Sequence, residues 1–297
     1  MTSKPFLLLK NNHSLLSNTI INYRKTVKND NKMKFNNIGV RIGENVKLGK
    51  NVRLGDYVTI YDNTTIGDNT VICEHSVIGE PLSGYYRDPN YENPATYIGG
   101  NSIIRTHCTV YAGNHIGEGF SSGHYMILRE HNKIGINCSV GNTSEFHGYV
   151  TIGDYCRLHS KVSLGKQAKF GNFIYMGPYC GTAEDPLPPS LICDAPVVGD
   201  FTYITVYVCI LSGVRVGKCC LLGAKSNLVT NTIIPDYSIT IGSPAKRVMD
   251  IRDFKSQYNE YQQYYPWMYN FDRGTPWQGM DFDKWAKAND VEVERFK

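Results

Sequence analysis

Residues 42–83 read IGENVK LGKNVR LGDYVT IYDNTT IGDNTV ICEHSV IGEPLS when they are divided into blocks of six. Every block opens on Ile or Leu, and Gly is the commonest second residue. The same period returns over 98–181 and 198–239. In these three stretches Ser122 is the only first residue that is not apolar. An internal repeat of this regularity determines the architecture before any local pattern does.

A six-residue period fits neither a half-buried strand, which repeats every two residues, nor a helix, which repeats every 3.6. A chain wound as a triangular prism buries one large apolar residue per side and needs a small residue near each corner. Three hexads then make one 18-residue coil, and successive coils stack about 4.8 Å apart. We therefore predict about nine coils, roughly 45 Å in length, with each coil stabilised mainly by its neighbours.

The end of the repeat reads GAKSNLVTNTIIPDYSITIGSPAKRV over residues 223–248. With the hexads, this segment resembles the closing coil and Gly-x-Pro-Ala-Lys loop of the hexapeptide-repeat acyltransferases, and the resemblance covers roughly residues 38–248. It implies an all-β solenoid, a left-handed parallel β-helix; the handedness comes from the resemblance alone. It also implies a homotrimer with active sites between adjacent prisms and an acyl donor that is acetyl-CoA or, in some members, acyl carrier protein.

The expected domain organisation has three parts. Residues 1–37 form an N-terminal extension, 38–241 the β-helix, and 242–297 a C-terminal loop, helix and aromatic tail. Two breaks in the period, at 84–97 and 182–197, are rich in Pro, Asn and Asp and are expected to be loops. Apolar and aromatic residues spaced by three and four predict an amphipathic helix after the last coil: Ile251, Phe254, Tyr258, Tyr261 and Tyr265.

Composition excludes several classes of protein. A net charge of +4 and a pI near 8.4 argue against a nucleic-acid binder. No apolar run approaches the length of a membrane span. The first 32 residues lack the apolar region and cleavage site of a secretory signal and give only a weak mitochondrial-type signal. We therefore expect a cytoplasmic protein.

The nine cysteines form neither a CxxC metal pattern nor an even-numbered disulfide framework. Those at the fifth position of a hexad are expected to be small core residues: Cys108, Cys138, Cys156, Cys180 and Cys220. Thiol catalysis is therefore not predicted.

His124 is the first candidate for catalysis. First and fifth positions point inward, so His124, at a third position, should face outward, as should His131, His147 and His159. The hexad of His124 carries the polar Ser122, and the fifth positions around it break the small-residue rule: Asn114, Phe120, Met126 and Asn132.

The segment SGHYMILREHNKIG, residues 122–135, resembles the TGHNxxIRExxxIG stretch of hexapeptide transferases that modify sugars. That resemblance implies a histidine general base, which we assign to His124, with His147 or His131 as the alternative. Arg129 and His147 are 18 residues apart and should stack on one face. Glu130 or Glu145 can orient an imidazole, and Arg129 can hold a phosphate or carboxylate.

The two loops are candidate substrate-binding elements. Tyr85, Tyr86 and Arg87 can stack on and pair with a nucleotide or phosphate. Asp185 lies in AEDPLPP, which resembles an Asn-Asp-x-x-Pro-Pro loop of sugar-modifying relatives, although Glu184 replaces the Asn. Tolerated surface insertions are the alternative interpretation of both loops.

The resemblance also assigns the acyl donor. Five residues match positions that line the pantetheine arm of CoA: Gly223, Ala224, Ser226, Gly242 and Pro244. Lys246 and Arg247 follow them and can pair with the phosphates of CoA. Glycines at coil corners have a purely structural explanation as well.

The sequence therefore predicts an acetyl-CoA-dependent acyltransferase that modifies an amino or hydroxyl group of a sugar or sugar nucleotide. No metal is expected. One alternative on the same fold is a zinc carbonic anhydrase, which would require His107, His124 and His131 to converge between subunits. A second alternative is a non-catalytic scaffold subunit.

Overall fold

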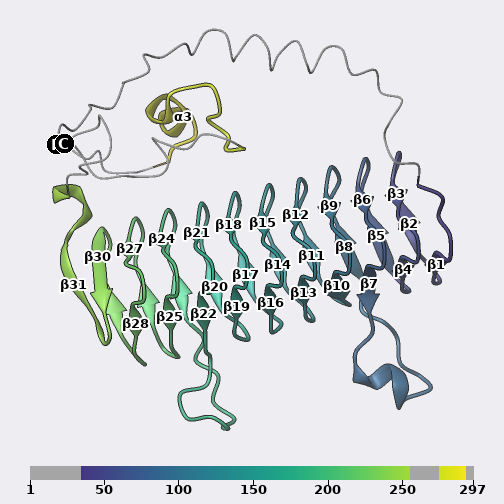
Figure 1. The fold of residues 1–297 in the computed structure, drawn as a ribbon, viewed down its shortest axis with the longest axis horizontal. Coiled ribbons are helices and arrows are strands. Elements are labelled where there is room, and N and C mark those ends of the chain that lie inside the picture. The colour runs from purple at the N-terminus through teal and green to yellow at the C-terminus, as the bar shows by residue number, and fades with distance from the viewer. Residues whose placement is uncertain (1–34, 255–273, 292–297) are drawn as a thin grey trace, which may run out of the picture. The chain divides into compact units, whose positions relative to one another are not determined.

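The computed structural model describes residues 35–254 and 274–291. Short strands stack into three parallel sheets, which we call sheets I, II and III (Figure 1). Sheet I contains β1 (Arg41–Ile42), β4 (Thr59–Ile60), β7 (Val77–Glu80), β10 (Thr109–Tyr111), β13 (Ile127–Leu128), β16 (Glu145–Phe146), β19 (Ser163–Leu164), β22 (Gly181–Thr182), β25 (Cys209–Ile210) and β28 (Asn227–Leu228).

Sheets II and III follow the same order along the chain. Sheet II contains β2 (Lys47–Leu48), β5 (Thr64–Ile66), β8 (Thr96–Ile98), β11 (His115–Ile116), β14 (Lys133–Ile134), β17 (Thr151–Ile152), β20 (Lys169–Phe170), β23 (Val197–Val198), β26 (Arg215–Val216) and β29 (Ile233–Ile234). Sheet III contains β3 (Arg53–Leu54), β6 (Val71–Ile72), β9 (Ile103–Ile104), β12 (Ser121–Ser122), β15 (Ser139–Val140), β18 (Arg157–Leu158), β21 (Tyr175–Met176), β24 (Tyr203–Ile204), β27 (Leu221–Leu222), β30 (Ser238–Gly242) and β31 (Ala245–Asp250).

This arrangement confirms the predicted left-handed parallel β-helix. Within uninterrupted coils, partners on neighbouring strands are 18 residues apart, as in the pair Ile42 and Ile60. Ten strands in sheets I and II exceed the nine coils expected. The difference comes from β22 and β30, whose first positions are the polar Thr182 and Thr240.

First and fifth positions of the hexads point into the prism, as predicted. Ile60, Ile116 and Leu164 are fully buried first positions, and Val58 and Val162 are fully buried fifth positions. The five fifth-position cysteines are buried as well. Burial raises the pKa of Cys180 to about 11 and that of Cys220 to about 11, so both stay protonated at neutral pH.

Second positions carry Gly where the next coil leaves no room for a side chain. A Cβ atom on Gly117 would lie 2.6 Å from the carbonyl carbon of Gly135, and one on Gly141 would lie 2.4 Å from the backbone nitrogen of Ser160. Close stacking of coils therefore explains these glycines.

Fourth positions make the turns, a feature that the sequence analysis did not predict. Corner I–II is the turn from a strand of sheet I to the next strand, in sheet II, and corners II–III and III–I are defined in the same way. At these turns φ is positive even without glycine, as in Tyr57 (59°), Asn69 (57°) and Lys161 (60°). A left-handed conformation costs a non-Gly residue about 1–2 kcal/mol.

Stacking between fourth-position side chains offsets part of that cost. At corner III–I, Tyr57, His75, His107 and Tyr125 form a ladder with ring centroids 4.8 to 5.1 Å apart. Such aromatic pairs contribute about 0.5–1.5 kcal/mol each beyond burial.

Ser122 is accommodated inside the prism. Its side chain is 3% exposed, and its Oγ accepts a hydrogen bond from the Arg105 backbone N–H at 2.8 Å. Phe120 and Met126 are fully buried on either side of it in sequence and supply the volume that a serine lacks. The polar first position therefore has a structural explanation and does not itself reach a ligand.

Both loops leave the β-helix at corner I–II (Figure 1). The first joins β7 to β8 through residues 81–95 and contains a short 3₁₀ helix, η2 (Ser83–Tyr86). The second joins β22 to β23 through residues 183–196. Four coils separate the two loops along this corner, which carries β10, β13, β16 and β19.

The described C-terminal residues pack on corner II–III. Here the fourth-position rings of Tyr155, Phe173 and Phe201 stack at 5.2 and 4.6 Å. Trp277 and α3 (Phe282–Ala288) complete a buried cluster with these rings. Most of the expected 251–265 helix lies outside the described residues, and Ile251 belongs to a short 3₁₀ helix, η3 (Ile251–Asp253).

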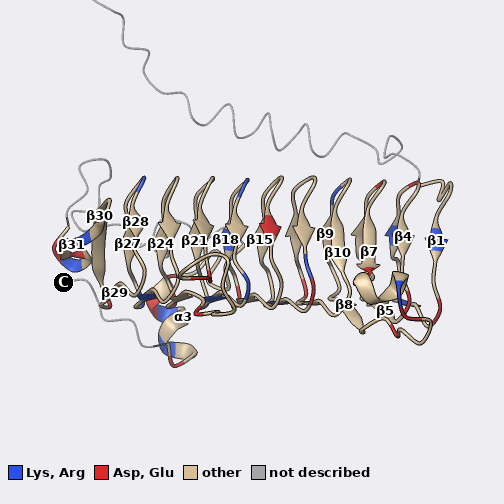
Figure 2. Cartoon of the chain, turned by 90° about the horizontal axis from the view of Figure 1, so that it is seen from below, with Lys and Arg blue, Asp and Glu red and all other residues tan. Residues whose placement is uncertain are grey.

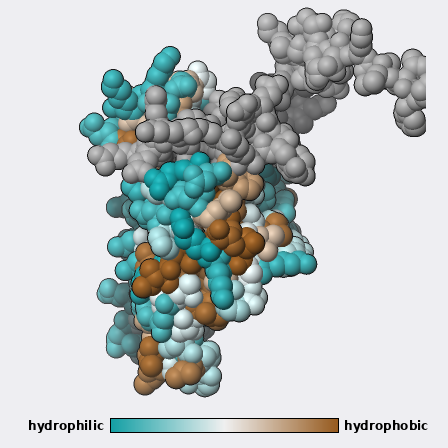
Figure 3. Space-filling model, turned by 90° about the vertical axis from the view of Figure 1, so that its left-hand side faces the viewer, coloured by the Kyte–Doolittle hydropathy of each residue, from teal (hydrophilic) through white to brown (hydrophobic). Residues whose placement is uncertain are grey.

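The surface of the described chain is mixed in character. Positive and negative positions are interspersed along the β-helix (Figure 2). Seen from the end that carries β31, apolar and polar groups also alternate (Figure 3). Exposed apolar side chains on the β30–β31 hairpin include Ile241, Val248 and Met249. In residues 35–254 and 274–291, no helix has the length and hydropathy required to cross a bilayer.

Trp277→Ala should release the segment 274–291 from corner II–III without unfolding the β-helix. Trp277 is 1% exposed and its ring lies 5.2 Å from that of Phe173, so truncation should cost about 3–5 kcal/mol of docking free energy. We expect faster hydrogen exchange in α3 and unchanged exchange in the strands. Tyr149→Ala, at an exposed stacked position, is the control; equal acceleration in α3 and the strands would contradict the prediction.

Candidate active site

The predicted site residues fall on two corners of the prism. His124 follows β12 and lies at corner III–I, as do Gly223, Ala224 and Ser226, which follow β27. The others lie on sheet I or along corner I–II: Tyr85, Tyr86, Arg87, Arg129, Glu130, His131, Glu145, His147 and Asp185. Sheet I separates the two corners, so one chain does not bring both sets into a single cluster.

His124 is exposed and oriented by its neighbours in the stack. Its backbone N–H donates to Asn142 Oδ1 at 2.7 Å, and its Nδ1 lies 2.7 Å from Thr106 Oγ1. Thr106 and Asn142 occupy the same position one coil before and one coil after. In the described part of the chain the Nε2 atom has no hydrogen-bond partner. The imidazole is therefore fixed at one nitrogen and accessible at the other.

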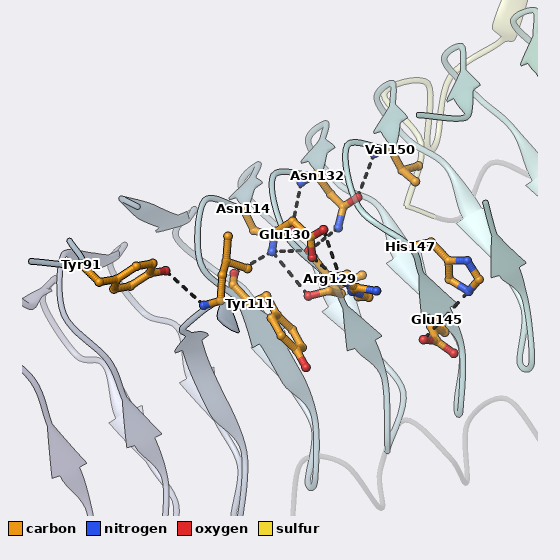
Figure 4. Close-up of polar contacts among 11 residues, drawn as sticks. Tyr91, Tyr111, Asn114, Arg129, Glu130, Asn132, Glu145, His147 and Val150 are labelled. Atoms are coloured by element: carbon orange, nitrogen blue, oxygen red, sulfur yellow. Dashed lines mark hydrogen bonds and ion pairs between the residues drawn. The ribbon is translucent and has the colours of Figure 1, made fainter. Parts of the chain in front are cut away.

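Sheet I presents a second group of polar side chains (Figure 4). His147 Nε2 lies 3.9 Å from Glu145 Oε1. Arg129 forms an ion pair with Glu130, with Nε 3.1 Å from Oε2. His131 occupies a left-handed turn position at corner I–II and stacks on Tyr149 at 5.0 Å. The structure thus brings Glu145 to His147, as expected, but engages Arg129 with its neighbour.

An amide ladder inside the prism holds this corner. Asn114 Nδ2 donates to the carbonyls of Tyr111 and Arg129, both at 2.7 Å, and Asn132 Nδ2 also donates to Arg129 O at 2.7 Å (Figure 4). The Oδ1 of Asn132 accepts from Val150 N–H at 2.9 Å. Both asparagines are buried. These departures from the small-residue rule therefore satisfy backbone groups under Arg129 rather than contacting a ligand.

The 81–95 loop carries a cluster of tyrosines. Tyr85 packs edge-on against Tyr61, Tyr86 and Tyr91. The hydroxyl of Tyr86 donates to Glu80 Oε1 at 3.3 Å. Burial raises the pKa of Glu80, and the bond from Tyr86 opposes that shift.

Arg87 is exposed at the end of η2, whereas the rings of Tyr85 and Tyr86 are already partly used in this cluster. Of the three loop residues predicted to bind substrate, Arg87 is therefore the one whose side chain has no ion pair or side-chain hydrogen bond within the described chain.

Asp185 organises its own loop. Its carboxylate accepts from Ser190 Oγ at 2.6 Å, from Ser190 N–H at 2.6 Å and from Leu187 N–H at 2.9 Å. The Ser190 hydroxyl in particular holds the pKa of Asp185 below its ordinary value. The structure therefore gives Asp185 a local role, and its predicted contact with substrate stays a prediction.

The residues predicted to bind CoA lie near the C-terminal end of the β-helix. Gly223 and Ser226 are buried, whereas Ala224, Gly242, Pro244 and Lys246 are exposed. Arg247 is engaged: its Nη2 lies 3.2 Å from Asp250 Oδ2 and its Nε 3.0 Å from Ser238 Oγ. Lys246 consequently has the freer charge of the two.

The outer face of sheet III contains a groove of about 410 Å³ that the sequence analysis did not identify. Its floor includes Ser121 and Ser139, and one wall includes Arg157, His159 and Tyr175. It reaches Gly123 and Ser160, next to the third positions of corner III–I where His124 lies. The signal was present in the 18-residue columns, where two small residues precede Arg157 and two glycines precede His159.

Metal-binding groups do not gather in the described chain. Across residues 35–254 and 274–291, no three His, Cys, Asp or Glu side chains could hold an ion together. His107 stacks between His75 and Tyr125 at corner III–I, and His131 lies at corner I–II. Within one chain, His107, His124 and His131 therefore do not form the ligand group that a carbonic anhydrase requires.

Comparison with known proteins agrees with the repeat. Residues 39–80 match the family model "Bacterial transferase hexapeptide (six repeats)". The chain is a hexapeptide-repeat protein. A 58-residue segment is 47% identical to a probable acetyltransferase of Mycobacterium tuberculosis; the match covers 19% of this chain and 19% of that protein. The hexapeptide-repeat chain therefore spans about a fifth of this curated relative.

Two solved structures are also similar. One is a UDP-N-acetylglucosamine O-acyltransferase from Moraxella catarrhalis, with 21% identity, a TM-score of 0.40, and coverage of 71% of this chain and 65% of that one. The other is a perosamine N-acetyltransferase from Caulobacter crescentus, solved with CoA and GDP-perosamine, with 17% identity, a TM-score of 0.33, and coverage of 66% and 86%.

Ser190→Ala should raise the pKa of Asp185 toward its ordinary 3.8. A carboxylate with a depressed pKa stabilises its loop at neutral pH and loses that effect as pH falls through the depressed value. The variant loop should therefore lose protection from proteolysis at a higher pH than the natural loop. Carboxyl ¹³C titration gives the pKa, and Ser190→Thr, which keeps the hydroxyl, is the control. An unchanged pKa in Ser190→Ala would exclude this role for the hydroxyl.

Proposed function

We propose that this protein is an acyl-CoA-dependent transferase that acetylates an amino or hydroxyl group of a sugar or sugar nucleotide. The geometry of His124 is the observation that carries the proposal. The hydrogen bond to Thr106 orients the ring, and the exposed Nε2 is available to a substrate. The short acetyltransferase match and the hexapeptide repeat support the same class of reaction.

In the proposed reaction, neutral His124 accepts a proton from the acceptor amine or hydroxyl. The acceptor then attacks the thioester carbonyl, the C–S bond breaks, and CoA leaves as the thiol. An imidazole is suited to this task because its ordinary pKa is close to neutral. A backbone N–H would stabilise the oxyanion of the tetrahedral intermediate.

We also propose a homotrimer whose active sites lie between subunits. A cyclic trimer joins two different surfaces of the protomer at each contact. Such a contact can place the corner III–I of one copy, with His124, against another surface of its neighbour. Separation of the predicted residues onto two corners of one chain supports this arrangement. His147, with Glu145 beside it, is the second candidate base.

The donor site that we propose is the C-terminal end of corner III–I and the β30–β31 hairpin. Exposed backbone at Ala224 and Gly242 would line the pantetheine arm, and Lys246 would meet a CoA phosphate. CoA supplies the activated acetyl thioester when it is bound. Ser226 is buried and 3.5 Å from Thr240 O, so its contribution would be to hold the coil rather than to touch CoA.

His124→Ala should lower kcat by about 10²–10⁴ while leaving the oligomer intact, because the variant lacks its general base. Release of free CoA thiol in the presence of amino- and hydroxy-sugar nucleotides measures turnover. His115→Ala, which removes an exposed histidine stacked on Tyr97 on sheet II, is the control. Normal turnover by His124→Ala would transfer the role to His147 or His159.

Lys246→Glu should raise KM for acetyl-CoA about 3- to 10-fold and leave KM for the acceptor nearly unchanged, since reversing one exposed charge weakens phosphate binding modestly. Added salt should reduce the difference. Lys133→Glu, which reverses an exposed charge on sheet II, is the control. Equal effects on both Michaelis constants would contradict the donor assignment.

A further inference from the structure

The groove on sheet III holds a cation that no acidic side chain of the described chain neutralises. The Arg157 guanidinium donates to three backbone carbonyls: Asn137, Cys156 at 3.3 Å and Gly274 at 2.7 Å. It forms no ion pair with a carboxylate in residues 35–254 or 274–291. Partial burial lowers the pKa of Arg157 somewhat, but a guanidinium remains charged at neutral pH.

Those three bonds fix the guanidinium without exhausting it. They use the Nη1 group and one hydrogen of Nη2, so Nε–H and the second Nη2 hydrogen have no partner in the described chain. A guanidinium has five N–H donors in a rigid plane and binds carboxylate and phosphate oxygens in pairs. Arg157 is therefore a preoriented site for an anionic group.

The opposite side of the groove supplies a further donor or acceptor. His159 Nε2 lies 2.7 Å from Tyr175 Oη. Burial raises the pKa of Tyr175, so the phenol keeps its proton at neutral pH and can donate it to Nε2. In that tautomer His159 carries its remaining proton on Nδ1. The imidazole is then oriented by Tyr175, much as His124 is oriented by Thr106.

The floor between these walls is small and hydroxylated. Ser121 and Ser139 occupy the outward sixth positions of consecutive coils, and neither hydroxyl has a partner in the described chain. Both neighbouring coils carry larger residues there, Ile103 before and Arg157 after. The hollow thus comes from two consecutive small residues, and its volume of about 410 Å³ is within the range of small-molecule sites.

We infer that this groove binds a sugar that carries a negative group, a carboxylate or a phosphate, with the anion on Arg157 and sugar hydroxyls over Ser121 and Ser139. Resting on the proposed function, this ligand is the acceptor, because the groove extends to the residues beside His124. The inference narrows the acceptor from sugars in general to acidic sugars and sugar phosphates.

Binding can be measured separately from turnover, by ligand-observed NMR with the full chain. Glucuronate tests the carboxylate, glucose 1-phosphate tests the phosphate, and glucose and inorganic phosphate are the neutral and sugar-free comparators. We expect one of the two anionic sugars to bind at least 10-fold more tightly than either comparator. Equal binding of glucose, or equal binding of inorganic phosphate, would overturn the inference.

Two variants locate the site. Arg157→Gln should weaken binding of the preferred probe about 10- to 100-fold, as expected for loss of a charge-assisted hydrogen bond. Because Arg157 also bonds to Gly274, Ser139→Ile provides a second test that fills the floor with a side chain tolerated at the same position by Ile103. Lys169→Gln and Thr151→Ile, at sixth positions of sheet II, are the matched controls. Unchanged binding in Ser139→Ile would exclude the groove.

The two proposals can fail separately. If the anionic sugar binds in the groove but no acetyl group is transferred to any sugar, the proposed function fails and the groove assignment stands as a binding site. If acetyl transfer to a neutral sugar proceeds normally in both Arg157→Gln and Ser139→Ile, the groove is not the acceptor site, and the inference fails alone.

Discussion

Hydrogen bonding between successive coils is the constraint on which the rest of the structure depends. Each short strand gives its N–H groups to the coil that follows, as in Gly117 N to Ile134 O at 2.8 Å, and the same pairing recurs along the β-helix. Buried backbone groups must be paired in this way, so the register of one coil sets that of the next. A side chain at any hexad position consequently lies over its counterpart 18 residues away.

This stacking explains how the functional groups are held. Thr106 and Asn142 fix His124 from the coils on either side, and the Asn114–Asn132 ladder fixes the backbone of Arg129. A site on such a scaffold is built in columns, and a change in one coil is felt chiefly by the coils that touch it. The groove on sheet III follows the same rule, since two small residues in one column are sufficient to make it.

Periodicity was enough to predict the fold, the inward-facing positions and the buried cysteines, because burial repeats strictly with the hexad. It did not predict the left-handed fourth positions, where residues such as Tyr57 and Lys161 give no local signal for a turn. It also misinterpreted Ser122, Asn114 and Asn132 as signs of a ligand site, although each satisfies backbone groups within the prism. Polar residues that break a repeat inside a core serve that purpose as readily as they serve chemistry.

Location of the groove required coordinates because its members come from different coils and from residue 274, far away in sequence. Arg157 looks like an ordinary outward arginine until its three carbonyl partners are known.

The strand that ends the β-helix has a consequence for assembly in solution. β31 runs antiparallel to β30, with Ser238 opposite Asp250, whereas all other strand pairs in the described chain are parallel. An open parallel edge is a template on which another copy could continue the spiral, and unchecked addition of that kind leads to fibres. The reversed strand presents an edge of the wrong polarity, so end-to-end polymer growth is blocked at this terminus by chain direction itself.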